Sequence, residues 1–234
     1  MRTAIDRAAR DAQALSRAGF DAVLVENFGD APFFKDNVPA VTIAAMTGCA
    51  LAAREAAPRL ALGINVLRND GLGALAIAAA TGASFVRVNV LSGARLTDQG
   101  IIEGRAADLA RLRASIAKGV RVFADVDVKH SVPLVPRAID EEVKELVERA
   151  HADAILLTGV ATGEPVDEAQ LDHVRRATNV PLFVASGATE RTVRALLAKC
   201  DGVIVGTAIK RGGRAGAPVD LDRAKRFARA ARHG

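Results

Sequence analysis

Short runs of β-branched and other apolar residues alternate along the chain with longer amphipathic stretches that are rich in alanine. The short runs have the length of buried strands, and the longer stretches repeat their apolar residues with helical spacing. Seven such repeats predict right-handed βαβ units around a parallel sheet. The predicted strands are 22–26, 60–65, 85–89, 120–127, 154–158, 182–186 and 203–206.

Eight predicted helices fill the intervals, at 4–18, 39–56, 73–81, 103–118, 140–150, 168–177, 189–200 and 222–232. No linker rich in Pro, Gly or Ser divides the chain, so residues 1–234 are expected to form one domain, a TIM (β/α)8-type barrel. The chain opens on a helix, and we therefore expect the first strand to be lacking, through a truncated start or cover by a neighbouring subunit. A doubly wound open sheet is the alternative.

Composition narrows the class of partner. Half of the residues are apolar and a quarter are charged, and no apolar run reaches the roughly 18 residues of a membrane span, so we expect a cytoplasmic protein. The net charge of +5 suits an anionic metabolite, an acidic membrane surface or nucleic acid. The chain lacks Trp and Tyr for base stacking, and its basic residues are scattered except in 210–232, so nucleic acid is not expected.

Polar residues collect directly after the predicted strands, which is where parallel α/β folds place their binding sites. Glu26 ends the first strand and is a candidate catalytic carboxylate. The candidate substrate-binding residues follow the first, second, third and fifth strands: Asn27, Asn65, Arg68, Asn69, Arg87, Asn89, Asp98, Gln99 and Thr158.

The fourth strand alternates with period two, which predicts that Asp125, Asp127 and Lys129 share the face that points into the barrel mouth. Buried charges of this kind require pairing or a ligand. They are candidate catalytic residues together with the adjacent His130, and Asp125 with Asp127 could hold Mg²⁺ or another divalent cation. A structural ion-pair ladder is the alternative, and no cofactor is firmly indicated because P-loop and dinucleotide-binding motifs are lacking.

Glycine-rich turns follow the last three strands, at 158–163, 186–187 and 206–207. Backbone N–H groups in such turns can bind an anion, and many barrels hold phosphate after their last two strands. Ser186, Gly187, Gly206 and Thr207 are therefore candidate phosphate-binding residues. The alternative is that these glycines only allow tight turns.

Several sequence blocks together resemble the BtpA/SgcQ family. They are Val-Glu-Asn-Phe-Gly-Asp-Ala-Pro-Phe at 25–33, Gly-Ile-Asn-Val-Leu-Arg-Asn-Asp at 63–70, Arg-Val-Asn at 87–89, Thr-Asp-Gln-Gly-Ile-Ile-Glu-Gly at 97–104, Phe-Ala-Asp-Val-Asp-Val-Lys-His at 123–130 and Asp-Gly-Val-Ile-Val-Gly-Thr at 201–207. The resemblance implies a ribulose-phosphate-binding type of barrel and a link to photosystem I biogenesis. Members usually begin with a block resembling Met-Val-His-Leu-Pro-Pro-Leu-Pro-Gly, which this sequence lacks.

Two functions follow from these observations. In the first, the barrel binds a small phosphorylated or anionic metabolite and acts on it as a lyase, isomerase or hydrolase. In the second, it is a non-catalytic assembly or stability factor for photosystem I or another membrane complex, peripheral to the membrane, and a loop with Phe28, Phe33 and Phe34 docks its partner. In either case the exposed strand edges of a seven-stranded ring favour a homo-oligomer.

Overall fold

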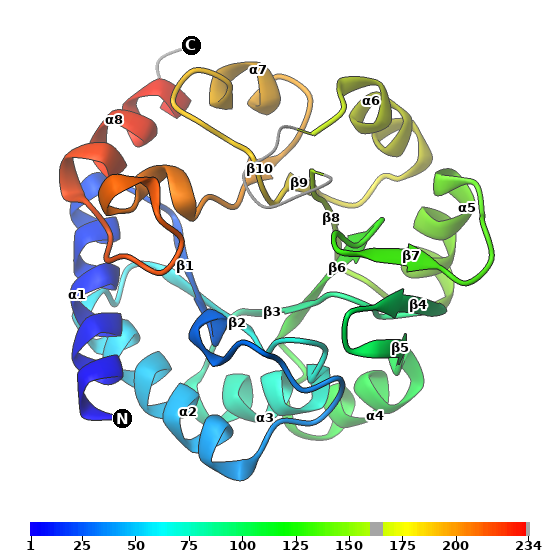
Figure 1. The fold of residues 1–234 in the computed structure, drawn as a ribbon, viewed down its shortest axis with the longest axis horizontal. Helices are drawn as coiled ribbons and strands as arrows, with labels where there is room; N and C mark the ends of the chain where they lie inside the picture. Colours follow the sequence, from blue (N-terminus) through cyan, green and yellow to red (C-terminus); the bar gives the residue numbers. More distant parts are fainter. Residues whose placement is uncertain (160–165, 233–234) are drawn as a thin grey trace.

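A computed structural model describes residues 1–159 and 166–232. Its main sheet has seven parallel strands that curl into a ring and follow one another in chain order (Figure 1). The strands are β1 Ala22–Glu26, β2 Ala61–Asn65, β3 Phe85–Val88, β6 Arg121–Val126, β8 Ala154–Leu157, β9 Leu182–Val184 and β10 Gly202–Val203. Among the described residues, β1 and β10 each pair on one side only, so they are the two edges of the ring.

Helices surround the ring, and none of those described is long and apolar enough to cross a membrane. They are α1 Arg2–Ala18, α2 Ala40–Ala56, α3 Gly71–Thr81, α4 Ala106–Ile116, α5 Ile139–Lys144, α6 Glu168–Ala177, α7 Val193–Leu197 and α8 Leu221–Arg232. Shorter helical segments are η1 Phe28–Asp30, η2 Glu145–Arg149, η3 Thr207–Ile209 and η4 Arg211–Gly213. Helix α1 packs against both α2 and α8, so the helical layer is continuous outside the two edge strands (Figure 1).

Side chains alternate between the helices and the interior of the ring. On β2, Leu62 and Ile64 belong to the hydrophobic core beneath the helices. Their neighbours Gly63 and Asn65 must face the interior, because successive strand residues point to opposite sides. The same alternation on β3 and β6 directs Arg87 and Asp125 inward.

Three phenylalanines fill the interior of the ring. The ring of Phe123 lies between Phe85, at a centroid distance of 4.7 Å, and Phe183, at 5.1 Å. Glycines on the neighbouring strands make room for them, since a Cβ on Gly63 would lie 2.2 Å from Cζ of Phe85 and one on Gly202 would lie 2.5 Å from Cε1 of Phe183. The amino-terminal part of the interior is therefore closed by aromatic side chains.

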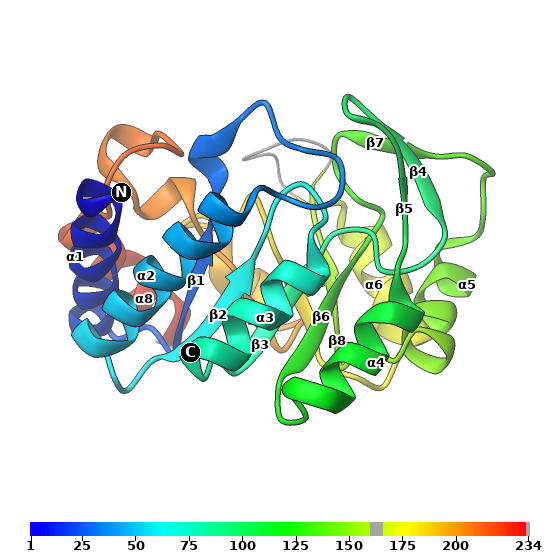
Figure 2. The ribbon, with the colours of Figure 1, turned by 90° about the horizontal axis from the view of Figure 1, so that it is seen from below.

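A second, antiparallel sheet of β4 Ala94–Thr97, β5 Gly100–Glu103 and β7 Ser131–Pro133 was not predicted. It rises beyond the carboxyl ends of the main strands, on the same side as segment 27–39 (Figure 2). The hairpin of β4 and β5 turns at Asp98 and Gln99. Sequence patterns missed it because its strands, Ala-Arg-Leu-Thr, Gly-Ile-Ile-Glu and Ser-Val-Pro, contain polar residues and no continuous apolar run, and one of them adjoins a helix.

Several predicted elements are shorter than expected. The helix predicted at 103–118 begins at Ala106 because Glu103 belongs to β5, and the one predicted at 189–200 is limited to Val193–Leu197. The helix predicted at 140–150 continues from α5 as a π-helix over Glu145–Arg149. These differences affect boundaries and leave the alternation of strands and helices unchanged.

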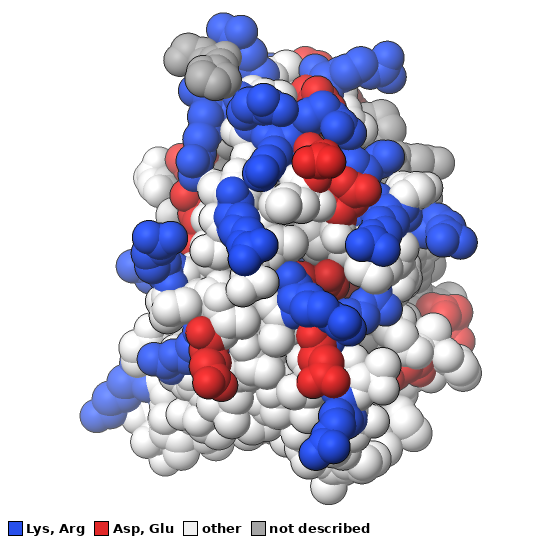
Figure 3. Space-filling view, turned by 90° about the vertical axis from the view of Figure 1, so that its left-hand side faces the viewer, with Lys and Arg blue, Asp and Glu red and all other residues white. Residues whose placement is uncertain are grey.

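The side of the molecule formed by α1 and α8 is basic (Figure 3). Segment 207–232, which includes α8, contains eight Lys and Arg residues against two Asp. This segment alone accounts for the excess positive charge of the chain. Its field attracts anions toward the half of the ring that contains β10 and β1.

We predict that Gly63→Ala lowers the free energy of unfolding by about 1–3 kcal/mol, because the added methyl group overlaps the ring of Phe85. Urea unfolding measures the change. Gly119→Ala is the control, since a Cβ at Gly119 meets no atom within 4 Å. Equal stability of the two variants would show that the ring of Phe85 moves to accommodate the added methyl group at little cost.

Candidate functional site

Four charged or polar side chains from neighbouring strands line the interior above the phenylalanines. Glu26 on β1 is in register with Asn65 on β2, and Asn65 is in register with Arg87 on β3. Asp125 follows on β6 and binds Arg87 directly. These residues stand at the carboxyl ends of their strands, which is the end that carries the active sites of barrel enzymes.

Asp125 is the most tightly held member of this layer. Its carboxylate accepts hydrogen bonds from Nε and Nη2 of Arg87 and from Nδ2 of Asn89, all at 2.8 Å. Burial alone would lower the pKa of Arg87, but the bidentate contact with Asp125 outweighs it and raises that pKa. Both oxygens of Asp125 are engaged, so the structural ion pair considered from the sequence describes this residue, which positions Arg87 and Asn89.

The predicted shared face of Asp125, Asp127 and Lys129 is wrong for Asp127, whereas Lys129 lies near Asp125. Strand β6 ends at Val126, and Asp127 has a φ of 51°, which interrupts the alternation. Asp127 instead accepts hydrogen bonds at 2.9 Å from Nη2 of Arg95 and from Nε2 of Gln170, and half of its side chain is exposed.

The separation of Asp125 from Asp127 removes the basis for a carboxylate pair that binds Mg²⁺. Each carboxylate already has its own arginine. Across residues 1–159 and 166–232, no group of three or more His, Cys, Asp or Glu side chains is placed to hold a metal ion. The residues present do not fit the predicted cation site.

Arg95 was missed as a central residue of the site. Its buried guanidinium donates hydrogen bonds to Asp127, to Glu142 at 3.1 Å and to Oγ of Ser131 at 2.7 Å. It thus fastens the second sheet to the end of β6 and to α5. Glu142 gave no sequence signal, because it lies in an acidic helix start that looks like an ordinary solvated face.

Lys129 and Arg68 lie close to the Arg87 and Asp125 pair. Nη2 of Arg68 donates a 2.8 Å hydrogen bond to the carbonyl oxygen of Lys129. Burial, together with the charge of Arg87, lowers the pKa of Lys129, while Asp125 and Glu26 act in the opposite direction. Burial also lowers the pKa of Arg68. Arg68, Arg87 and Lys129 thus lie among the carboxylates of Glu26, Asp125 and Asp98, so cationic groups for an anionic ligand are present at the mouth. His130 is exposed and has a φ of 56°.

Within residues 1–159 and 166–232, the side chains of Asn65 and Thr158 in the interior are buried without hydrogen-bond partners. Both Nδ2 and Oδ1 of Asn65 are unpaired, and the residue is fully buried. Oγ1 of Thr158, which follows β8, is also unpaired in a residue that is 4% exposed. Buried polar atoms without a partner are rare in folded proteins, and they are common where a ligand or enclosed water is required.

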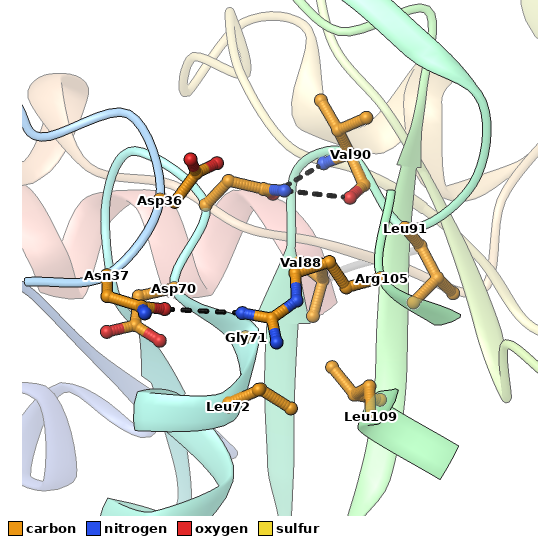
Figure 4. A pocket seen from close by; sticks show the side chains of 11 residues that line it. Asp36, Asn37, Asp70, Gly71, Leu72, Val88, Val90, Leu91, Arg105 and Leu109 are labelled. Atoms are coloured by element: carbon orange, nitrogen blue, oxygen red, sulfur yellow. Dashed lines mark hydrogen bonds between the residues drawn. The ribbon is translucent and has the colours of Figure 1, made fainter. Parts of the chain in front are cut away.

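Other predicted binding residues support loops. Asn27 accepts a 2.7 Å hydrogen bond from the backbone N–H of Leu67, and Asn69 exchanges two hydrogen bonds with the backbone of Val90. A cavity of about 10 Å³, room for one water, lies beside Val90 near Asn37 and Arg105 (Figure 4). Asp98 and Gln99 form the hairpin tip, and Asp98 acts electrostatically on Arg68.

The turns after β9 and β10 lie on adjacent strands. Gly187 has a φ of 71°, and Gly206 has space around it, because a Cβ there would meet no atom within 4 Å. Within the described ranges, no acceptor pairs with the backbone N–H groups of Gly187, Gly206 or Thr207. Ser186 precedes them and has a partner of its own. Residues 160–163 of the third predicted turn lie outside the described residues.

The arrangement of strands resembles that of solved barrel enzymes. Thiamine phosphate pyrophosphorylase from Pyrococcus furiosus superposes with a TM-score of 0.62 at 14% identity, covering 95% of this chain and 88% of that one. N-(5'-phosphoribosyl)anthranilate isomerase from the same organism superposes with a TM-score of 0.61 at 17% identity, covering 94% and 92%. These likenesses confirm the predicted class, a TIM-barrel type of fold.

The chain belongs to the BtpA family, whose family model matches residues 1–233. A Methanocaldococcus jannaschii protein is 45% identical over 95% of this chain and 84% of its own length. A Synechocystis protein, named photosystem I biogenesis protein BtpA, is 43% identical over 98% of this chain and 80% of its own length. The resemblance inferred from the sequence blocks is therefore confirmed.

We predict that Asp125→Asn destabilises the fold by about 3–5 kcal/mol, because the buried guanidinium of Arg87 loses its counter-charge. Denaturant unfolding measures the change. The matched control is Asp127→Asn, which should change stability by less than about 1 kcal/mol because its carboxylate is half exposed. Similar values for the two variants would contradict a central structural role for Asp125.

Proposed function

We propose that this protein binds a small phosphorylated metabolite at the carboxyl ends of its parallel strands. The observation that carries the proposal is the pair of adjacent turns at Gly187 and Gly206, whose backbone N–H groups have no acceptor among the described residues, together with the open Cβ position of Gly206. Neighbouring strands are about 5 Å apart, so both turns can contact one phosphate. The phosphate would lie on Ser186, Gly187, Gly206 and Thr207.

The rest of the ligand would occupy the mouth of the ring. Arg68, Arg87 and Lys129 supply positive charge there, and burial together with the charge of Arg87 lowers the pKa of Lys129. Lys129 and Glu26 are the proposed acid–base residues, and Asp125 holds Arg87 in place. Several proteins with a similar fold are named as enzymes of phosphorylated compounds. This similarity supports a phosphorylated ligand by analogy only.

We expect millimolar inorganic phosphate to raise the Tm of the protein and Gly206→Val to reduce this rise. A ligand that binds the folded state stabilises it, and the added side chain would fill the space that the phosphate needs. Gly206 has a φ of −125° and a ψ of −78°, a combination outside the main regions allowed to residues with a Cβ, so the Tm of Gly206→Val without phosphate is measured first to establish that the variant is folded. Differential scanning fluorimetry measures both values.

Gly119→Val is the matched control, since Gly119 also has an open Cβ position and precedes β6 at the opposite end of the ring. It should keep the full phosphate effect. No stabilisation of the wild type, or an equal rise in Gly206→Val, would show that these glycines only turn the chain. Chloride at the same ionic strength separates specific binding from general screening.

A docking role is the second candidate function. Phe28 and Phe34 are 42% and 58% exposed, and Leu96 stands in register with Ile101 and Val132 in a second exposed apolar row. Exposed apolar groups of this kind mark interaction surfaces. We propose that they support self-association or the docking of a partner complex.

Replacing Phe28 and Phe34 by serine together should shift sedimentation toward the monomer and leave the phosphate-induced rise in Tm unchanged. Both side chains are exposed, so their removal should not unfold the protein. A wild type that is monomeric at micromolar concentration would contradict self-association. Loss of the phosphate effect in the double variant would place the two phenylalanines in the ligand site instead.

A further inference from the structure

We infer that Asn65 and Thr158 are specificity residues that hydrogen-bond hydroxyl or carbonyl groups of the ligand, so that the metabolite is a polyhydroxylated phosphate. This inference rests on the proposed phosphate site and names the chemistry of the remainder of the ligand. It begins from three buried polar atoms, Nδ2 and Oδ1 of Asn65 and Oγ1 of Thr158, that have no partner.

The placement of these atoms is specific. Strand alternation directs Asn65 into the interior, because Ile64 before it belongs to the core under the helices. Thr158 follows Leu157, which also belongs to that core, and so continues the inward-facing set of β8. The strands β2 and β8 are separated by β3 and β6, whose inward residues are Arg87 and Asp125. The two unpaired side chains thus flank the buried ion pair.

The ion pair of Arg87 and Asp125 does not provide hydrogen-bond partners for Asn65 and Thr158. The carboxylate of Asp125 is already engaged by Arg87 and Asn89. An unpaired buried donor or acceptor carries a desolvation penalty that a folded protein normally avoids, and this layer retains three such atoms. In a binding site such unpaired atoms provide specificity, because a ligand without matching hydrogen-bonding groups leaves them unpaired and binds more weakly.

The chemistry of these atoms indicates the class of ligand. Asn65 offers one donor and one acceptor side by side, and Thr158 offers a hydroxyl that can do either. Vicinal hydroxyl groups, or a hydroxyl beside a carbonyl, satisfy the amide of Asn65, and a further hydroxyl of the same ligand satisfies Thr158 across the two intervening strands. An aromatic body would leave them unpaired. The three phenylalanines lie one layer deeper and pack against one another, so they offer no aromatic slot at the level of Asn65.

Isothermal titration with three probes tests the inference: inorganic phosphate, D-ribose 5-phosphate and phenyl phosphate. The wild type should bind D-ribose 5-phosphate more tightly than inorganic phosphate, and phenyl phosphate should gain nothing over inorganic phosphate. Thr158→Val and Asn65→Leu keep the side-chain volume nearly constant. They should weaken the binding of D-ribose 5-phosphate about threefold to tenfold for each hydrogen bond lost. Neither should change binding of inorganic phosphate.

Thr81→Val is the matched control, because Thr81 is buried and its hydroxyl donates a 2.8 Å hydrogen bond to the carbonyl oxygen of Ile77. Thr81→Val should lower the free energy of unfolding. Thr158→Val should leave that free energy unchanged, because the hydroxyl group that it removes is unpaired in the free protein. Only Thr158→Val should alter D-ribose 5-phosphate binding. This contrast separates a ligand contact from an ordinary buried threonine.

The outcomes distinguish the inference from the proposed function. If inorganic phosphate binds but the wild type does not prefer D-ribose 5-phosphate, or if both variants keep that preference, Asn65 and Thr158 hold enclosed water only and the inference is overturned. If no phosphate compound binds, the phosphate site and the inference that rests on it are both wrong. A preference that disappears in both variants and survives in Thr81→Val supports the inference.

Discussion

The bidentate ion pair between Arg87 and Asp125 organises the upper interior of this barrel-type fold. A charge in such a place must be paired, and pairing two strands through their side chains fixes the distance between β3 and β6 at their carboxyl ends. Below this pair the phenylalanines exclude water, and above it the side chains that can contact a ligand begin. The ion pair therefore forms the floor of the candidate site, and its neighbours form the walls.

The site combines an excess of positive charge with unused hydrogen-bonding groups. Most polar residues that follow the strands are engaged in supporting the loops, as Asn27 and Asn69 are. Among the described residues, the groups without a partner include the backbone N–H groups at Gly187 and Gly206 and the side chains of Asn65 and Thr158. Under the proposed function, the former would bind the phosphate and the latter would bind hydroxyl groups of one elongated ligand.

Membership of the BtpA family is compatible with either proposed role. The Synechocystis relative is named for photosystem I biogenesis, whereas the fold is shared with enzymes at less than 20% identity. A fold supports many functions, so the decision between the two roles lies in the chemistry of the site. The unpaired groups at the mouth favour a bound metabolite, and the exposed phenylalanines at Phe28 and Phe34 favour a partner surface. The two roles use different residues and can coexist.

The sequence by itself determined the parallel barrel-type sheet, the number of its main strands and the end at which polar residues gather. These properties follow from local periodicity and from the fixed directions of strands in βαβ units. Only the tertiary structure decided which polar residues are available. Asp125 and Asp127 look equivalent in an alternating run, but Asp127 has a positive φ and binds Arg95, on a strand whose mixed polar sequence gave no strand pattern. Hydrogen-bond partners come from distant parts of the chain, so whether Asn65 is paired or unpaired cannot be inferred from its neighbours in sequence.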